Sequence, residues 1–357
     1  MASKLFSPIK IRNVEFRNRL FVSPMCQYSC LKGDGVPTDW HLVHLGSRAT
    51  GGAGLVMSEA SGVSLEGRIS ELDLGIWSDT QMEAFKHITA FIESQGAVPG
   101  IQIAHAGRKA STAAPWLGGG PILPEDGGWR PVAPSPIKFD EGHAIPEELS
   151  SEGIDAIFNK FFEAAERALK AGFKVIEIHM AHGYLLHEFL SPLSNRRTDQ
   201  YGGSFENRIR LPLKIANAIR EFWPQDLPVF VRISATDWVE DGWDPQQSIA
   251  FVKELKKVGI DLLDISSGGM VPYAKIPAAP GFQTPFSSAI KHETGITTGA
   301  VGLILSPLQA EHILVVGDAD VIFIGRDELR DPYWPLHAAH ALHAEIKWPP
   351  QYERAKI

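Results

Sequence analysis

Short apolar runs alternate regularly with longer amphipathic segments from Leu20 almost to the C-terminus, and few folds are compatible with this alternation. Runs rich in β-branched residues predict strands, and apolar residues that recur every three to four positions predict helices. Strands that alternate with helices form a parallel sheet, and eight such units close into a barrel. We therefore expect an α/β fold, a TIM (β/α)8 barrel.

The expected strands are short and spread along the chain; they cover residues 20–25, 53–60, 98–106, 173–181, 228–235, 262–269, 296–302 and 320–326. The clearest helical periodicity covers residues 80–95, 151–171, 207–223 and 245–258. Barrels of this class commonly exceed about 250 residues as one unit, so we expect residues 1–357 to form a single domain.

Two segments depart from this alternation. Residues 108–150 separate the third expected strand from its helix and are rich in Gly, Pro and Trp, and residues 348–357 form a Pro-rich tail. Loops as long as the first segment usually carry function. We expect residues 108–150 to form a lid over the barrel mouth; a surface decoration is the alternative.

Charge and cysteine content exclude several classes of protein. The net charge is -8 and no basic stripe is present that could neutralise a phosphate backbone, so we expect no nucleic-acid partner. Two cysteines, Cys26 and Cys30, cannot build a disulfide framework or ligate an iron–sulfur cluster. The chain shows neither an apolar signal sequence nor about 18 consecutive apolar residues. We expect a cytoplasmic protein with no membrane partner.

The carboxyl ends of the strands form the active site of such barrels, so the residues at each expected strand end are candidates for chemistry. Glycines follow the seventh and eighth strands, at Gly299, Gly302 and Gly325, and Arg326 comes next. Backbone N–H groups beside a guanidinium suit a phosphate. The pattern predicts a phosphorylated ligand, although glycines in turns can also serve conformation alone.

The fourth strand ends in HMAHGY, which brings His179, His182 and Tyr184 to one strand end. Two imidazoles can hydrogen-bond an oxygen on which negative charge develops, and a phenol can deliver a proton. A zinc site and a buried structural pair are the alternatives. Zinc would need a third ligand such as His105 or Glu177, and no metal-binding motif is present, so we expect no metal.

Two further strand-end residues need an explanation from their surroundings. Arg232 lies within the apolar strand VFVRIS, where a buried guanidinium requires an acidic side chain or an anionic ligand. Cys26 ends the first strand; a lone cysteine is usually a small buried apolar residue, but this position favours a role in the site.

The segments SPMCQY, IQIAHAGRKA, HMAHGYLLHEFLSPLSNRRTDQYGGSFENR and FIGRDELRDP closely resemble the Old Yellow Enzyme family, and most closely its bacterial-type subgroup that includes xenobiotic reductase A. The similarity extends from SPIKIRN near the N-terminus to QYER near the C-terminus. Its most specific part is the block from HMAHGY to YGGSFENR.

The resemblance implies roles for individual residues. His179 and His182 match the pair that holds the activating oxygen of the substrate, Tyr184 matches the proton donor, and Tyr28 matches a tyrosine that contacts ligand. Arg354 matches an arginine that reaches into the active site of a neighbouring subunit. The residues that match FMN-binding positions are Ser23, Pro24, Met25, Cys26, Ala60, Gln102, Arg232, Gly325 and Arg326, to which the phosphate pattern adds Gly302. Cys26 matches a residue that tunes the flavin.

The function implied is that of an FMN-dependent ene-reductase. NADPH (or NADH) would reduce the flavin, and an α,β-unsaturated carbonyl or nitro compound would then be reduced at its carbon–carbon double bond in a ping-pong cycle. The resemblance also implies a homodimer or a homotetramer built of dimers. The seventh strand lacks the tryptophan that the xenobiotic-reductase branch carries beside its glycine, so we expect a wider substrate pocket.

Three alternatives compete with this interpretation. A phosphate-binding aldolase or isomerase barrel would need a Schiff-base lysine or a carboxylate base at a strand end, and none stands out. Dienoyl-CoA reductases and amine dehydrogenases carry an iron–sulfur cluster, for which two cysteines do not suffice. A non-catalytic flavin-binding protein would bind the cofactor without turnover.

Overall fold

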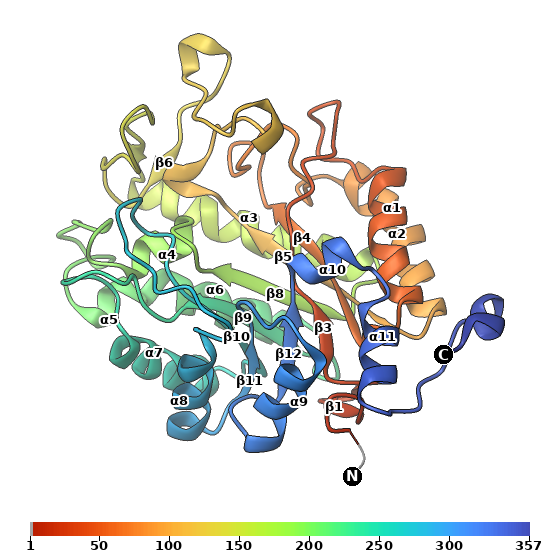
Figure 1. The fold of residues 1–357 in the computed structure, drawn as a ribbon. Coiled ribbons are helices and arrows are strands. Elements are labelled where there is room, and N and C mark those ends of the chain that lie inside the picture. Colours follow the sequence, from red (N-terminus) through yellow and green to blue (C-terminus); the bar gives the residue numbers. More distant parts are fainter. Residues whose placement is uncertain (1–2) are drawn as a thin grey trace.

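The computed structural model describes residues 3–357 and confirms the expected barrel, in which eight parallel strands form a closed sheet surrounded by helices (Figure 1). The strands follow one another around the barrel in chain order, and the last pairs with the first. They are β3 (Leu20–Val22), β4 (Leu55–Gly62), β5 (Val98–Ala104), β8 (Val175–Met180), β9 (Val229–Ser234), β10 (Leu262–Ser266), β11 (Thr297–Ala300) and β12 (Val321–Ile324). Each lies within or overlaps a run predicted from the sequence.

Helices follow the strands on the outside of the barrel; they are α1 (Asp39–Thr50), α2 (Asp79–Ser94), α3 (Ser151–Lys170), α4 (Leu185–Leu190), α5 (Phe205–Arg208), α6 (Arg210–Phe222), α7 (Pro245–Lys257), α8 (Thr284–Thr294), α9 (Pro307–Val316), α10 (Arg326–Arg330) and α11 (Trp334–Ala341). Side-chain caps fix several starts: the Ser78 hydroxyl accepts from the Gln81 N–H at α2, and the Asp244 carboxylate accepts from the Gln247 N–H at α7.

One helix prediction was wrong in its details. The segment 207–223 was expected as a single helix, but α5 ends at Arg208 and α6 begins at Arg210. Pro212 has no N–H with which to bond the Arg208 carbonyl, so the helical hydrogen-bond ladder is interrupted at this point.

The amino-terminal end of the barrel is closed by a hairpin that the sequence did not reveal. Strands β1 (Ile9–Ile11) and β2 (Val14–Phe16) pair antiparallel. They place the Phe16 ring 4.8 Å from the Phe21 ring at the bottom of the barrel, and Phe230 and Phe323 pack against Phe21. Because this end is filled with aromatic side chains, polar chemistry is confined to the opposite end.

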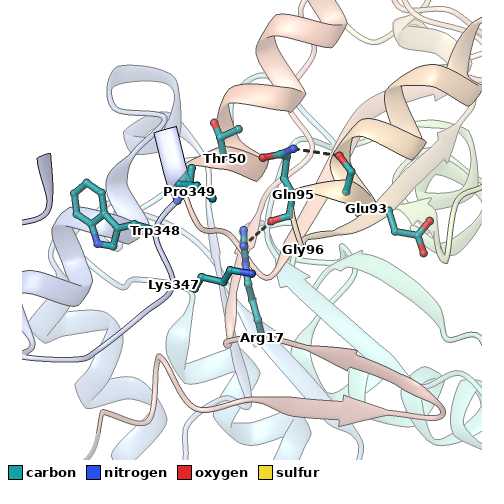
Figure 2. A pocket seen from close by; sticks show the side chains of 10 residues that line it. Arg17, Thr50, Glu93, Gln95, Gly96, Lys347, Trp348 and Pro349 are labelled. Carbon is teal, nitrogen blue, oxygen red and sulfur yellow. Dashed lines mark hydrogen bonds between the residues drawn. The ribbon is translucent and has the colours of Figure 1, made fainter. Parts of the chain in front are cut away.

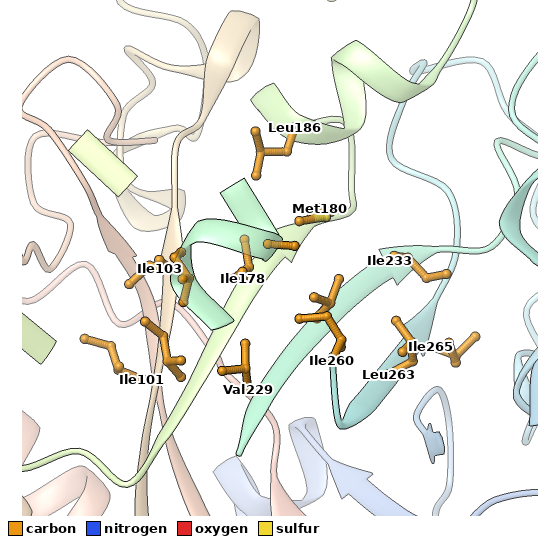
Figure 3. Close-up of a cluster of buried hydrophobic side chains, with 14 of the residues drawn as sticks. Ile101, Ile103, Ile178, Met180, Leu186, Val229, Ile233, Ile260, Leu263 and Ile265 are labelled. Atoms are coloured by element: carbon orange, nitrogen blue, oxygen red, sulfur yellow. The ribbon is translucent and has the colours of Figure 1, made fainter. Parts of the chain in front are cut away.

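Alternate residues of the strands face opposite sides of the sheet. Apolar residues such as Ile101, Ile178, Val229 and Leu263 belong to one large buried cluster (Figure 3). The residues between them include Gln102, Glu177, Arg232 and Asp264, all buried and polar. Toward the carboxyl ends of the strands, the period of two therefore separates an apolar outer face from a polar layer on the inner face of the barrel.

The segment 108–150 lies at the carboxyl ends of the strands, where it bonds to the loop after β10 and to the segment between α4 and α5. Arg108 donates to the carbonyl of Met270 at 2.7 Å, and the Ser135 hydroxyl accepts from the N–H of Arg196. Its regular parts are short: η1 (Gly107–Lys109), η2 (Pro115–Leu117), η3 (Pro124–Asp126), β6 (Val132–Ala133) and β7 (Glu147–Glu148).

The C-terminal residues include η4 (Pro350–Ala355), which extends away from the barrel (Figure 1). Among the helices described, none combines the length and the apolar character that crossing a membrane requires.

Candidate active site

A cavity of about 350 Å³ lies between the loops after β11 and β12 and is lined by residues that include Gly302, Gly325, Arg326 and Arg330. Gly302 has a φ of 113°, and a Cβ there would come within 2.5 Å of the Gln283 amide nitrogen, so only glycine fits. Two guanidinium groups beside glycine backbone make a suitable site for a phosphate. The sequence predicted three of these residues; Arg330, which pairs with Asp327, was missed.

A buried polar layer lies inside the barrel. Gln102 donates to the Glu177 carboxyl at 2.7 Å, and the Arg232 guanidinium lies 3.1 Å from the Asp264 carboxylate. Burial raises the pKa of Glu177 to about 8 and the pKa of Asp264 to about 6, while the charge of Arg232 opposes both shifts. Asp264 is therefore the acidic partner that was expected for a buried Arg232. Asp264 itself was not among the residues predicted from the sequence.

His179, His182 and Tyr184 come together at the end of β8, as predicted. The His182 Nδ1 and His179 Nε2 atoms are 3.4 Å apart, and the His179 and Tyr184 rings meet edge to face at 5.2 Å. Burial lowers the pKa of both histidines far below its usual value, and the nearby charge of Arg232 lowers it further. Both imidazoles are therefore neutral at physiological pH.

The turn that presents these side chains is unusual, because His182 and Gly183 are both left-handed, with φ values of 61° and 74°. The Gly183 N–H donates to His187 Nδ1 at 2.9 Å, and His187 Nε2 lies 3.1 Å from the buried Asp237 carboxylate. Because Nδ1 accepts, the proton of this imidazole lies on Nε2, the nitrogen on the side of Asp237. The sequence analysis missed this supporting pair.

The other wall is the segment between β3 and α1, which carries Ser23, Pro24, Met25, Cys26 and Tyr28. Burial raises the pKa of the Cys26 thiol, and the acidic Asp73 and Glu59 raise it further, so Cys26 stays protonated. Glu59 accepts from the Gln27 N–H at 2.8 Å, with His41 on its other oxygen at 3.3 Å.

Tyr28 connects this wall to the segment 108–150. Its ring packs edge to face on Trp116 of η2, with 5.9 Å between the ring centres. Of the remaining predicted residues, Ala60 lies in register with Gln102 on the neighbouring strand.

Arg354 is not brought to this site within one chain. It is exposed in η4, and the tail residues before it line a cavity with Arg17 and Gln95 (Figure 2). Arg17 lies just before β3 and Gln95 just before β5, so this cavity is at the amino-terminal end of the barrel, opposite the histidines.

Lys109 is a charged residue at the site that was not predicted from the sequence. It lies beyond the end of β5, and the search for a lysine was limited to strand ends. Its ammonium donates to the carbonyls of His182 at 2.9 Å and Gly269 at 3.1 Å. It also lies over the rings of Tyr184, at 5.0 Å, and Phe139, at 4.6 Å. Among residues 3–357, no cluster of three or more His, Cys, Asp or Glu side chains is arranged to hold a metal ion.

Comparison with known proteins identifies the family. Residues 4–345 match the model of the NADH:flavin oxidoreductase / NADH oxidase family. The chain belongs to this family. It is 48% identical to the NADPH dehydrogenase of Geobacillus thermodenitrificans over an alignment of 354 residues. This alignment covers 99% of both chains. The resemblance to the Old Yellow Enzyme family is thereby confirmed, and the protein is an NAD(P)H-dependent flavin oxidoreductase.

Solved structures agree with this assignment. The old yellow enzyme homologue from Zymomonas mobilis superposes with a TM-score of 0.79 at 28% identity, covering 97% of this chain and 94% of that one. A 2-naphthoyl-CoA reductase superposes with a TM-score of 0.86 at 26% identity over 95% of this chain, which spans only 52% of that protein.

The family implies FMN as the bound cofactor and a nicotinamide as the reductant, and the residues present fit FMN. Gly302, Gly325 and Arg326 form a cradle in which a dianionic phosphate would meet positive charge and bare backbone. Arg232 supplies a buried positive charge inside the barrel. Among the buried polar atoms of the described residues, one Glu177 carboxyl oxygen and His179 Nδ1 lack a hydrogen-bond partner. Such orphaned polar atoms are compatible with a polar ligand against this layer.

Proposed function

We propose that this protein is an ene-reductase, which reduces the carbon–carbon double bond of α,β-unsaturated carbonyl or nitro compounds at the expense of NADPH (or NADH). The observation that carries the proposal is the convergence of two neutral imidazoles and a protonated phenol at the end of β8. FMN, once reduced by the nicotinamide, would supply the hydride.

His179 and His182 would bind the oxygen of the activating carbonyl or nitro group. Neutral imidazoles donate through N–H, and such donors stabilise most strongly the negative charge that builds on the oxygen in the transition state. Their arrangement is fixed by neighbours: the His182 N–H of the backbone donates to Ser234 Oγ, and His182 Nε2 lies 2.7 Å from Ser266 Oγ.

Tyr184 would give its proton to the α-carbon. Burial raises the pKa of this phenol well above its usual value near 10, so the proton is retained at physiological pH until negative charge develops on the substrate. The Cys26 thiol, which also stays protonated, is poorly suited to act as a nucleophile. Its proposed role is to tune the flavin, and Tyr28 would contact the substrate.

The remaining residues would hold the cofactor. Gly302, Gly325 and Arg326 would bind its phosphate, and Arg232 would stabilise negative charge on the bound ring. The surrounding positions proposed to contact FMN are Ser23, Pro24, Met25, Ala60 and Gln102.

A visible spectrum tests this function directly. We expect the purified protein to show a flavin spectrum that NADPH bleaches without oxygen and that cyclohexenone then restores, and the flavin released by denaturation to be FMN. Bleaching without recovery on adding any enone or nitroalkene would exclude the ene-reductase while leaving the flavin oxidoreductase in place. FAD, or no flavin at all, would contradict the cofactor site itself.

We also propose a homodimer, or a homotetramer built of dimers, in which Arg354 completes the pocket of a partner. Its support is the resemblance, together with an Arg354 that is exposed and follows tail residues at the end of the barrel opposite the histidines. Removing residues 348–357 should raise the KM for enone by about 10-fold or more, the scale of one hydrogen bond to a charged group, while FMN stays bound. Arg354→Ala should reproduce most of the effect. Light scattering that shows a monomer with full activity would refute this arrangement.

A further inference from the structure

Lys109 occupies a position that the proposed reaction does not yet explain. It ends η1, directly before the long segment 108–150 continues, and its ammonium is enclosed between two aromatic rings. Two of its three N–H donors are committed to the carbonyls of His182 and Gly269. A lysine held by two carbonyls is not free to form a Schiff base, so the reason for its placement lies elsewhere.

The carbonyls of His182 and Gly269 belong to the two loops beside Tyr184, the proposed proton donor. A Cβ on Gly183 would come within 2.1 Å of the Gly269 carbonyl oxygen, so the turns after β8 and β10 are in direct contact here. Lys109 ties these turns together and holds its charge over the ring of Tyr184, 5.0 Å from the ring centre. Phe139, from the segment 108–150, covers the ammonium from another direction at 4.6 Å.

A cation over an aromatic face interacts with the electron density of the ring, and it stabilises a phenolate more than a phenol because the phenolate carries a full negative charge. Water would weaken this effect, but the two rings and two carbonyls keep the ammonium largely out of water. Burial around the ammonium lowers the pKa of Lys109 to about 8, which brings its charge within reach of an ordinary pH series.

We propose that Lys109 is a positioning residue for proton transfer: its ammonium stabilises the negative charge that develops on Tyr184 as the phenol gives up its proton, and the oxidative half-reaction therefore depends on whether Lys109 is charged. This inference rests on the proposed ene-reductase function. It adds to that function an electrostatic control of the proton donor by a lysine near the start of the segment 108–150.

Other titratable groups face the same region and must be separated from Lys109. Those around Lys109 are Arg108, Glu188, His143, His179 and His182; those around Tyr184 are His179, Cys26, Tyr28 and Asp73. Burial raises the pKa of Asp73 and of Glu188 to about 8 each, so their ionisation overlaps that of the lysine. A pH profile of the wild type alone therefore cannot assign the responsible group, and a variant is required.

The sign of the effect follows from the charge. Below pH about 8, Lys109 is protonated and assists the transfer; above it, the charge is lost and the transfer slows. We expect the rate of flavin reoxidation by cyclohexenone, measured by stopped flow, to fall about 10-fold across this range in the wild type. Lys109→Met should show the low rate at every pH, with no decrease near pH 8. In Lys109→Arg the reoxidation rate should also show no decrease near pH 8, because a guanidinium stays charged. At pH 9 and above this rate should exceed the rate of Lys109→Met.

Two controls separate this role from a structural one. Reduction of the flavin by NADPH should change by less than about 2-fold in Lys109→Met, and in a Tyr184→Phe background the same substitution should have no further effect on reoxidation. Titration of the lysine itself, by NMR of [13C]methylated lysines with the Lys109 signal identified by its loss in Lys109→Arg, should give a midpoint near 8.

The outcomes distinguish the two proposals. If NADPH bleaches the wild type but no enone restores it, the ene-reductase fails and the role of Lys109 fails with it. If the wild type is restored but Lys109→Met keeps the decrease near pH 8, Asp73 or Glu188 causes that decrease and Lys109 does not. If Lys109→Met slows reoxidation equally with and without the Tyr184 hydroxyl, the lysine is purely structural.

Discussion

Replacing Asp237 with alanine should lower the free energy of unfolding by about 2–5 kcal/mol, because it leaves buried hydrogen-bond donors without an acceptor at about 1–3 kcal/mol each. The Asp237 carboxylate is fully buried and accepts hydrogen bonds from the Ser191 hydroxyl at 2.6 Å and the Trp243 N–H at 2.8 Å, and it pairs with His187 at 3.1 Å. Alanine leaves the Ser191 hydroxyl and the Trp243 N–H without this acceptor and removes the carboxylate beside His187. Urea unfolding of the FMN-bound protein measures the loss.

The matched control for this variant is Asp155→Ala, which removes an exposed ion pair with Lys214 and should cost less than about 1 kcal/mol. Equal losses in the two variants would contradict the importance of the buried pair. Burial by itself would raise the pKa of Asp237, but the neighbouring His187 imidazole and the hydrogen bonds that the carboxylate receives outweigh burial and lower this pKa. Its contribution is therefore present at neutral pH and is lost only as the pH falls through that lowered pKa.

The same substitution connects stability to the site. His187 accepts from the Gly183 N–H, and Gly183 lies between His182 and Tyr184 in a turn of two left-handed residues. Without Asp237, the proton on His187 is no longer held on Nε2, so the turn loses its defined acceptor. We expect the surviving folded protein to bind enones more weakly than the wild type.

The barrel could be predicted because its signal is repeated: eight strand-like runs, each between helical segments, leave few other topologies. The position of the candidate site could be predicted for the same reason, since chemistry in this fold collects at one end of the strands. Asking which side chains end a strand selected His179, His182 and Tyr184, which the structure brings together, and Arg232, which it buries beside Asp264.

What escaped prediction depends on contacts between distant segments. The strands of the hairpin β1–β2 are three residues each, too short to show a period. Lys109 lies five residues beyond the end of β5, and only the packing of three loops brings its ammonium over Tyr184. The pair of His187 with Asp237 joins residues 50 positions apart, and nothing in the local sequence of either one indicates the other.

Replacing Tyr184 with phenylalanine should separate the two halves of the proposed cycle. The change removes only the hydroxyl, so reduction of the flavin by NADPH should persist while reoxidation by cyclohexenone slows by about 100-fold or more, the usual loss when a general acid is removed. Nitroalkenes should be affected least, because the anion formed on hydride addition is already stable and can take its proton from solvent.

Histidine variants should behave differently from Tyr184→Phe, and this difference tests the assignment of roles. Replacing His179 or His182 removes a donor to a buried ligand oxygen, which should weaken the binding of enones and phenols by about 1–3 kcal/mol. Stopped-flow measurement of the two half-reactions in each variant resolves binding from proton transfer. If Tyr184→Phe reduces cyclohexenone at the wild-type rate, water or another residue supplies the proton. The role proposed for Lys109 would then have no phenolate to act upon.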